Sequence, residues 1–266
     1  MAKIEAVILD WAGTLVDYGC MAALETYKEL FKEYGIKLST AEARKGMGLD
    51  KVDHIREMLE NERVSQLWFK KYGMEPNEGD VRELNRKFEK LIITKFETYS
   101  QPKEYVVAAL AQLREQGLRI GTTTSYTHEM MDVLVKLAAK KKLEVDLVIN
   151  SEDVKGQGRP NPFMLFKNME KLGICSVRSV VKVGDTVNDI LEGVNAGVYS
   201  VGVIDGSSEM GLSYEEFEEL SEEEKEERRR VVRDRFKKAG AYYTINNLKS
   251  LPYLINAIQN NKEFKL

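Results

Sequence analysis

The sequence predicts an α/β fold, in which a doubly wound parallel sheet carries an α-helical domain inserted after its first strand. Three observations predict this fold. An apolar run that includes Val7, Ile8 and Leu9 ends in Asp10 and, without polar alternation, suits a strand buried on both faces. Residues 18–99 then show only helical patterns. From residue 100 onward helical and strand patterns alternate, which is typical of a parallel sheet covered by helices.

The composition excludes several other classes of protein. The 266 residues are 43% hydrophobic and 31% charged, enough for one large or two modest domains. The net charge of −3 gives no broad basic field that would attract nucleic acid. No apolar run approaches the roughly 20 residues of a membrane span, and the N-terminus enters a strand at once. We therefore expect no signal peptide, no membrane and no nucleic-acid partner.

Cysteine and histidine are both scarce. Cys20 and Cys175 are too far apart in the sequence to suggest a disulfide framework, so we expect a cytoplasmic protein. His54 and His128 are the only histidines in the sequence, which argues against a zinc site or a Ser-His-Asp triad.

The helical domain follows from apolar side chains three and four positions apart. Ser39 followed by Glu42 predicts a capping box, and Gly35 ends the helix before it. Besides the helix that Ser39 opens, we expect helices at residues 24–34, 51–60, 64–72 and 81–99. The chain then divides into a helical domain, residues 18–99, and an α/β core, residues 1–17 and 100–266.

The core follows from the alternation of the two patterns after residue 100. We expect its further strands at residues 118–124, 145–149, 180–183, 198–203 and 242–245. The helices of the core are expected at residues 104–116, 162–172 and 187–196, after a Thr127 cap, and at the C-terminus. The charged run at residues 215–235 places acidic residues before arginines, which fits the helix dipole and predicts a solvated helical face.

Polar residues stand where several of these strands end. Asp10, Thr124 and Asp185 end three strands, and Arg159 lies in the loop after another. Open α/β sheets bind ligands at this edge, so we expect the four residues to lie close together. A strand-end aspartate taken alone is more often a loop cap, and only the whole set favours phosphoryl chemistry.

Each of the four residues has a task if the substrate carries a phosphoryl group. The two aspartates offer hard oxygen ligands to Mg²⁺. Thr124 can donate a hydrogen bond to a phosphoryl oxygen, and the guanidinium of Arg159 can neutralise its charge. Asp10 can then act as a nucleophile and form an aspartyl phosphate.

This order of motifs resembles the haloacid dehalogenase superfamily. The resemblance rests on Asp10-Trp11-Ala12-Gly13-Thr14, Thr124, Arg159, and Gly184-Asp185 followed by Asp189. It implies a haloacid dehalogenase-like core with a helical cap domain between the first two motifs, where residues 18–99 stand. It also implies that Asp189 supports the metal site without contacting the metal itself.

Ala12 narrows the reaction. Phosphatases of the superfamily usually carry a second aspartate two residues after the nucleophile, which protonates the leaving oxygen. Ala12 stands at that position and has no proton to give. Two interpretations remain, an inactive relative and an enzyme whose leaving group needs no protonation on oxygen.

Lys51 and His54 offer a reason for such a leaving group. They are three residues apart and would share one face of a helix. A desolvated lysine can form a Schiff base with an aldehyde. The resulting iminium is an electron sink that allows a P–C bond to break. Taken alone, however, Lys51 would be read as a surface lysine.

The resemblance becomes specific to the phosphonoacetaldehyde hydrolase (phosphonatase) family over nearly the whole chain. It is carried by residues 10–20, 47–54, 124–131, 182–186 and 206–209. It implies cleavage of the P–C bond of phosphonoacetaldehyde, a small-molecule phosphonate. It also implies a homodimer joined through the cap domains.

The resemblance assigns a role to each site residue. Asp10 is the nucleophile and Lys51 the Schiff-base lysine. Asp10, the backbone carbonyl of Ala12 and Asp185 hold Mg²⁺. The other implied roles are phosphonyl binding for Arg159 and Thr124, proton transfer for His54 and Tyr126, and lining of the pocket near Lys51 for Cys20 and Met47.

The sequence departs from the family at Leu15, at Gly46 and in the loop 154–158, which is longer and carries Lys155 where a proline is expected. This loop change leaves the placement of Arg159 open. Two other functions are weighed against the hydrolase. A Mg²⁺-dependent phosphomonoesterase or phosphomutase requires an acid where Ala12 stands, and a non-catalytic binding protein gives no reason to keep Asp10, Lys51 and Asp185.

Overall fold

Within residues 3–260 the chain folds around one parallel sheet of six strands, in the order β3-β2-β1-β4-β5-β6. The computed structural model describes residues 3–260. The strands are β1 (Ala6–Leu9), β2 (Arg119–Thr124), β3 (Leu147–Asn150), β4 (Val180–Gly184), β5 (Tyr199–Val203) and β6 (Tyr243–Ile245). Strand β1 is central and pairs with β2 and β4, which brings the carboxyl ends of these three strands together.

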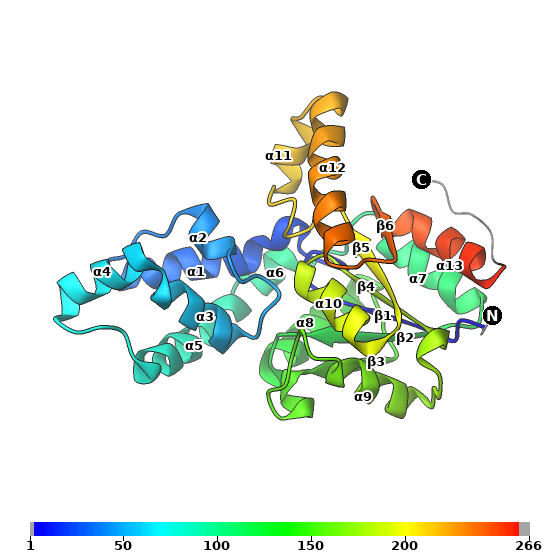
Figure 1. Cartoon of the computed structure of the whole chain (residues 1–266), viewed down its shortest axis with the longest axis horizontal. Helices are drawn as coiled ribbons and strands as arrows, with labels where there is room; N and C mark the ends of the chain where they lie inside the picture. The colour runs from blue at the N-terminus through cyan, green and yellow to red at the C-terminus, as the bar shows by residue number, and fades with distance from the viewer. Residues whose placement is uncertain (1–2, 261–266) are drawn as a thin grey trace.

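Helices cover both faces of the sheet (Figure 1), which confirms the doubly wound prediction. Val7 and Leu9 of β1 pack in the cluster that includes α7 (Val106–Glu115), α8 (His128–Lys140) and α13 (Leu251–Gln259). Ala6 and Ile8 point to the other face and pack against α9 (Phe163–Leu172) and α10 (Val187–Ala196). All four side chains are fully buried, as the continuous apolar run of β1 predicts.

The predicted helical insertion is present and lies beside the carboxyl edge of the sheet (Figure 1). It contains α1 (Met21–Glu33), α2 (Thr40–Arg44), α3 (Lys51–Glu60), α4 (Glu62–Tyr72) and α5 (Glu78–Ile93). The Ser39 capping box is confirmed, because Ser39 Oγ accepts from Glu42 N–H and the Glu42 carboxylate accepts from Ser39 N–H. We call these helices the cap.

One helix prediction is wrong in its length. The pattern at residues 81–99 suggests one helix, but α5 ends at Ile93 and a separate helix, α6 (Phe96–Tyr99), follows. The hydroxyl of Thr94 donates to the carbonyl of Leu91 over 2.6 Å. Such a local hydrogen bond competes with the regular helical ladder and accounts for the break.

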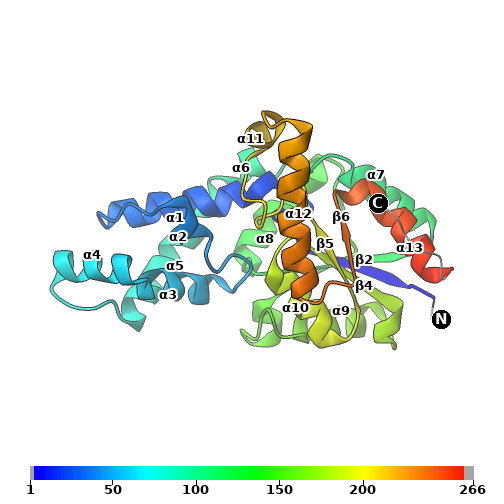
Figure 2. The same cartoon turned by 45° about the horizontal axis from the view of Figure 1, so that its top comes forward.

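The charged run forms two helices, α11 (Tyr214–Glu218) and α12 (Glu222–Lys238). Most of α12 is exposed, but Val232 and Phe236 are buried. Figure 2 shows α12 on the β6 side of the sheet, near α10. Short 3₁₀ helices complete the fold: η1 (Tyr18–Cys20), η2 (Ser151–Val154), η3 (Val177–Ser179) and η4 (Leu248–Ser250). Between residues 3 and 260, no helix is both long and apolar enough to span a bilayer.

Candidate active site

Asp10 stands at the carboxyl end of β1, where its backbone N–H donates to the carbonyl of Val183 in β4 over 2.9 Å. The chain then turns sharply at Gly13, whose φ of +82° lies in the left-handed region. A Cβ at Gly13 would lie 2.1 Å from Oδ2 of Asp185, so only glycine fits this approach. The turn therefore packs the loop after Asp10 against Asp185.

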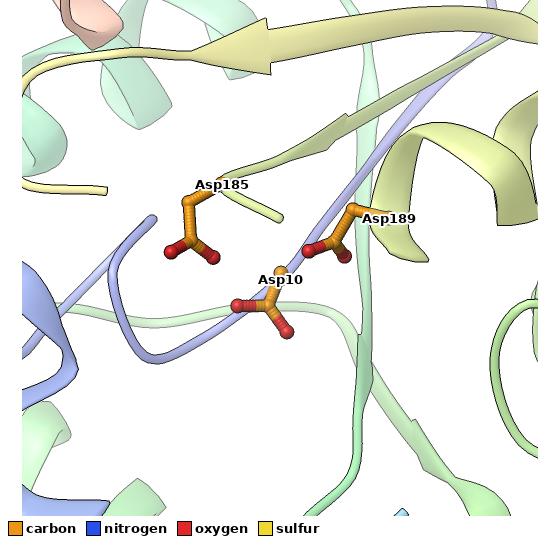
Figure 3. A group of neighbouring side chains, drawn as sticks. All are labelled: Asp10, Asp185 and Asp189. Atoms are coloured by element: carbon orange, nitrogen blue, oxygen red, sulfur yellow. The ribbon is translucent and has the colours of Figure 1, made fainter. Parts of the chain in front are cut away.

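Three buried aspartates meet at this edge of the sheet (Figure 3). Carboxylate oxygens of Asp10, Asp185 and Asp189 all lie within 4.8 Å of one another. Burial, together with the charges of Asp10 and Asp189, raises the pKa of Asp185 well above its usual value. Burial also raises the pKa of Asp10, although the guanidinium of Arg159 opposes this shift. Such a group of buried oxygen ligands suits a divalent cation, which would remove the repulsion between the carboxylates.

Arg159 reaches this cluster in spite of the longer loop before it. Its Nη2 lies 2.7 Å from Oδ1 of Asp10, and its side chain is almost completely buried. The charges of Asp189 and Asp10 outweigh the effect of burial and raise the pKa of Arg159, which stays protonated. The changed loop therefore does not displace Arg159 from Asp10.

Lys51 opens α3 from the cap side and is only 5% exposed. Burial lowers the pKa of its amine below the usual 10.5. Its Nζ lies 5.1 Å from the centre of the Tyr126 ring. Lys51 is thus no surface lysine, and its burial raises the fraction of neutral amine, the form that imine formation requires.

His54 is placed differently from the other predicted residues. It is fully buried one turn after Lys51 and packs on the ring of Tyr27, with the ring centres 4.5 Å apart. Neither ring nitrogen makes a well-aligned hydrogen bond among the described residues, although the backbone of Ala43 and Lys45 lies beside the ring. Burial, with a smaller contribution from Lys51, lowers the pKa of His54 to about 3. Its ring is therefore neutral near pH 7 and lies behind Lys51.

A small cavity of about 30 Å³ lies between cap and core. All the predicted site residues except His54 and the supporting Asp189 line it: Asp10, Ala12, Cys20, Met47, Lys51, Thr124, Tyr126, Arg159 and Asp185. Thr124 Oγ1 accepts a hydrogen bond from the N–H of Tyr126 over 3.1 Å, which leaves its hydroxyl proton free to donate. The structure therefore places an amine of lowered pKa and a strand-end carboxylate in one cavity.

Comparison with known proteins agrees with this geometry. Residues 7–203 match the family model of haloacid dehalogenase-like hydrolases. The phosphonoacetaldehyde hydrolase of Lysinibacillus sphaericus is 48% identical over 256 residues, which cover 96% of this chain and 95% of that protein. The chain belongs to the phosphonoacetaldehyde hydrolase family.

Two further relatives support membership of this family. The crystal structure of a phosphonoacetaldehyde hydrolase-like protein from Oleispira antarctica superposes with a TM-score of 0.95 at 34% identity, covering 98% of this chain and 94% of that one. A bifunctional phosphonoacetaldehyde hydrolase/aminoethylphosphonate transaminase of Clostridioides difficile is 47% identical over 97% of this chain. The matched part makes up 40% of that longer protein.

The structure also shows buried polar residues next to Arg159 that the sequence analysis did not identify. Thr123, Lys182 and Glu192 are all completely buried behind Arg159. A signal for Lys182 was present, because a lysine within an apolar strand buried on both faces requires a partner. Glu192 stands three residues after Asp189 and therefore shares its face of α10.

Proposed function

We propose that this protein hydrolyses the P–C bond of phosphonoacetaldehyde to acetaldehyde and phosphate. The observation that carries the proposal is the pairing of Lys51 with Asp10 in one cavity, beside Ala12 rather than an acid. An amine of lowered pKa can form a Schiff base with an aldehyde substrate, whereas hydrolysis of a phosphate ester would not use this amine. The names of relatives at 44–48% identity support the same reaction.

The first step uses Lys51. Its neutral amine adds to the aldehyde carbon, and the addition product takes up a proton and loses water to leave a protonated Schiff base. The carbon of this iminium lies β to phosphorus, so the electron pair of the P–C bond can form a C=C bond while the C=N electrons move onto the positive nitrogen. The burial of Lys51 supports this step, because it raises the fraction of neutral amine at a given pH.

Asp10 then attacks phosphorus. Its carboxylate oxygen forms the new P–O bond, while the electrons of the P–C bond move into the iminium and give an enamine. We assign the phosphonyl oxygens to Arg159 and Thr124, both of which line the cavity beside Asp10. This step yields an aspartyl phosphate without protonation of a leaving oxygen, so Ala12 at the acid position is no defect.

The last steps return the enzyme to its starting state. The enamine takes up a proton on carbon, water hydrolyses the imine to release acetaldehyde, and a second water hydrolyses the aspartyl phosphate. We propose that Tyr126 and His54 assist the proton transfers, His54 through water because it lies outside the cavity. Cys20 and Met47 would shape the space around the aldehyde.

Mg²⁺ is the cation we propose for the aspartate cluster. Asp10, Asp185 and the carbonyl of Ala12 would hold it, with Asp189 supporting the site. The three buried carboxylates fit this assignment, since burial and mutual repulsion raise the pKa of Asp185 in the absence of a cation. When bound, Mg²⁺ supplies positive charge that allows an anionic nucleophile to approach an anionic phosphonyl group.

We also propose the domain limits and the assembly of the protein. The cap domain spans residues 18–99, and the core spans residues 1–17 and 100–266, of which 1–2 and 261–266 lie outside the described residues. A homodimer joined through the caps is supported by exposed apolar side chains at the end of α4, namely Phe69, Tyr72 and Met74. We place the protein in the cytoplasm.

An assay of two substrates separates this function from a phosphomonoesterase or phosphomutase. The purified protein with Mg²⁺ should release acetaldehyde and phosphate in equal amounts from phosphonoacetaldehyde, and little phosphate from p-nitrophenyl phosphate. The Asp10→Asn variant should release neither product. Turnover of the ester with no release of acetaldehyde would mean that the phosphoryl-transfer core serves another substrate and that Lys51 has no catalytic role.

A further inference from the structure

A buried polar cluster lies behind the reacting groups and is made of Thr123, Lys182 and Glu192. Their exposed fractions are all 0%. None of the three lines the cavity, so none can touch a substrate there. A lysine and a glutamate that are fully removed from water need a reason, because the desolvation of two charges is costly even when they are paired.

Each member of this cluster contacts Arg159 or its partners. Nε of Arg159 lies 3.1 Å from Oε2 of Glu192, and its Nη2 donates to Oγ1 of Thr123 over 2.9 Å. Nζ of Lys182 lies 3.0 Å from the same Glu192 oxygen and 2.6 Å from Oγ1 of Thr123. The hydroxyl of Thr123 in turn donates to Oε2 of Glu192 over 3.1 Å. One carboxylate oxygen therefore joins the two cations and the hydroxyl.

We propose that Glu192 is a positioning residue for Arg159. It holds the Nε edge of the guanidinium, while Nη2 points at Asp10 and at the group that Asp10 attacks. This inference rests on the proposed function, in which Arg159 binds the phosphonyl oxygens. It adds a residue that acts on the reaction through Arg159 and without contact to the substrate.

Glu192 is the carboxylate suited to this task. Asp10 and Asp189 also lie within 3.2 Å of Arg159, but both belong to the aspartate cluster that suits a cation. Asp10 must also turn from Arg159 to phosphorus during the reaction. Glu192 lies outside that cluster and outside the cavity, so it stays with Arg159 throughout.

Lys182 and Gly193 explain how Glu192 can occupy this place. Nζ of Lys182 lies 2.9 Å from Oδ1 of Asp189 as well, so it balances two carboxylates on adjacent turns of α10. A Cβ at Gly193 would lie 2.7 Å from Oγ of Ser200 and 3.3 Å from Cβ of Lys182. Glycine at this position lets α10 lie close to β4 and β5, which brings Glu192 within reach of Arg159.

The test measures the binding of inorganic phosphate to the Mg²⁺-loaded protein by calorimetry. Glu192→Gln keeps the shape of the side chain and removes its charge, and we expect it to weaken phosphate binding about tenfold. The matched control is Glu42→Gln, which removes the charge from a carboxylate–arginine pair in the cap, Glu42 with Arg63. This control should bind phosphate as the wild type does.

A second measurement shows whether Glu192→Gln changes only the phosphate site. Acetaldehyde with borohydride should label Lys51 in Glu192→Gln as in the wild type, because imine formation does not use Arg159. If Glu192→Gln does not fold, Thr123→Val replaces it, since this isosteric change removes the hydroxyl that joins Arg159, Lys182 and Glu192. We expect that variant to weaken phosphate binding several-fold.

A double-mutant cycle decides whether Glu192 acts through Arg159. Arg159→Lys alone should weaken phosphate binding. In that background Glu192→Gln should weaken it little further, because the ammonium group of lysine has no planar guanidinium whose orientation Glu192 could fix. Additive effects, or unchanged phosphate binding in Glu192→Gln, would overturn the inference. Unchanged phosphate binding in Arg159→Lys would instead refute the role of Arg159 in the proposed function.

Discussion

Lys51 and Asp10 come to the same cavity from separate parts of the chain, one from the first turn of α3 and the other from the end of β1. Their pKa values are shifted by the same cause in opposite directions. Burial lowers the pKa of the lysine amine and raises that of the carboxyl group. The neutral amine is the form that the proposed Schiff base needs, whereas Asp10 needs a cation nearby to react as a carboxylate.

The first prediction concerns Lys51→Arg. A guanidinium keeps the positive charge but cannot form a Schiff base, so turnover of phosphonoacetaldehyde should fall on the order of a thousandfold or more. Phosphate binding should change little, because the residues proposed to bind the phosphonyl group, Arg159 and Thr124, lie on the core. Lys45→Arg is the matched control in the cap, since Lys45 is exposed and should tolerate the change. Near-normal turnover by Lys51→Arg would exclude the imine mechanism.

The second prediction concerns pH. Imine formation needs the neutral amine, so kcat/KM should rise with pH and level off once pH exceeds the pKa of Lys51. Because burial lowers this pKa, the plateau should begin below the ordinary value of 10.5. A profile of kcat/KM between pH 6 and 10 measures it. A rate that still climbs in proportion to hydroxide up to pH 10 would show that Lys51 titrates as a free lysine.

The residues that the sequence analysis identified were those with a local signal. Asp10, Thr124 and Asp185 stand at the ends of strands. Ala12 is informative because phosphatases of the superfamily carry an aspartate at this position. Lys182 and Glu192 were missed because their meaning depends on pairing between a strand and a helix. Tertiary packing decides which carboxylate on a helix pairs with a lysine in a buried strand. The sequence shows only that each of the two groups needs a partner.

At the scale of elements, the loop between α2 and α3 is where the cap packs against the core. The Nδ2 of Asn188 in α10 donates to the carbonyl of Met47 over 3.2 Å. Gly48 next to it has φ of +87°, and a Cβ there would lie 2.4 Å from Oγ1 of Thr186. The cap therefore closes over the core through a backbone approach that a side chain would prevent.

The third prediction compares Gly48→Ala with Gly73→Ala. Both glycines have positive φ, so both changes should cost about 1–2 kcal/mol in stability. Only Gly48 faces the core, whereas a Cβ at Gly73 would meet nothing within 4 Å. Gly48→Ala should therefore lose roughly ten- to a hundredfold in kcat/KM, and Gly73→Ala should lose almost none. Equal activities of the two variants would show that the contact with Thr186 does not position the cap.

The type and order of the helices and strands were largely predictable, because apolar spacing of two or of three and four residues is a local property. The boundaries moved by a few residues, as at α7, expected from residue 104 and observed from Val106. The break between α5 and α6 was not predicted. It depends on one side-chain hydrogen bond, from Thr94 to Leu91, that apolar spacing does not reveal.

At the scale of the whole molecule, the chain crosses between core and cap near Asp17. This residue is buried, and its carboxylate accepts from the N–H groups of Met21 and Ala22. Burial raises its pKa from 3.8 to about 7. The folded state therefore binds more protons than the unfolded state between these pH values, and this residue's contribution to stability falls as pH rises through them.

The fourth prediction tests this coupling with Asp17→Asn. Asparagine keeps an acceptor for the two N–H groups but does not ionise. Between pH 5 and pH 8 the free energy of unfolding of the wild type should fall by roughly 2.5 kcal/mol relative to the variant. Urea unfolding at the two pH values measures both proteins. A constant difference between them would mean that Asp17 does not titrate in this range.

The arrangement of the whole sheet was beyond the sequence analysis. Alternating helices and strands predict a doubly wound sheet, but the order β3-β2-β1-β4-β5-β6 depends on long-range pairing. This order places the ends of β1, β2 and β4 side by side and thereby brings Asp10, Thr124 and Asp185 together. The convergence of the site was predicted from the general rule that parallel strands share one carboxyl edge.

The central claim is that Lys51 forms a Schiff base with a phosphonoaldehyde beside Asp10. Borohydride added during turnover of phosphonoacetaldehyde with Mg²⁺, followed by peptide mass spectrometry, tests it most directly. Loss of activity that requires substrate, with a reduced two-carbon adduct on Lys51 alone, is the result we predict. Full release of acetaldehyde in the presence of borohydride, with Lys51 unmodified, would contradict the claim and leave only the phosphoryl-transfer chemistry of Asp10.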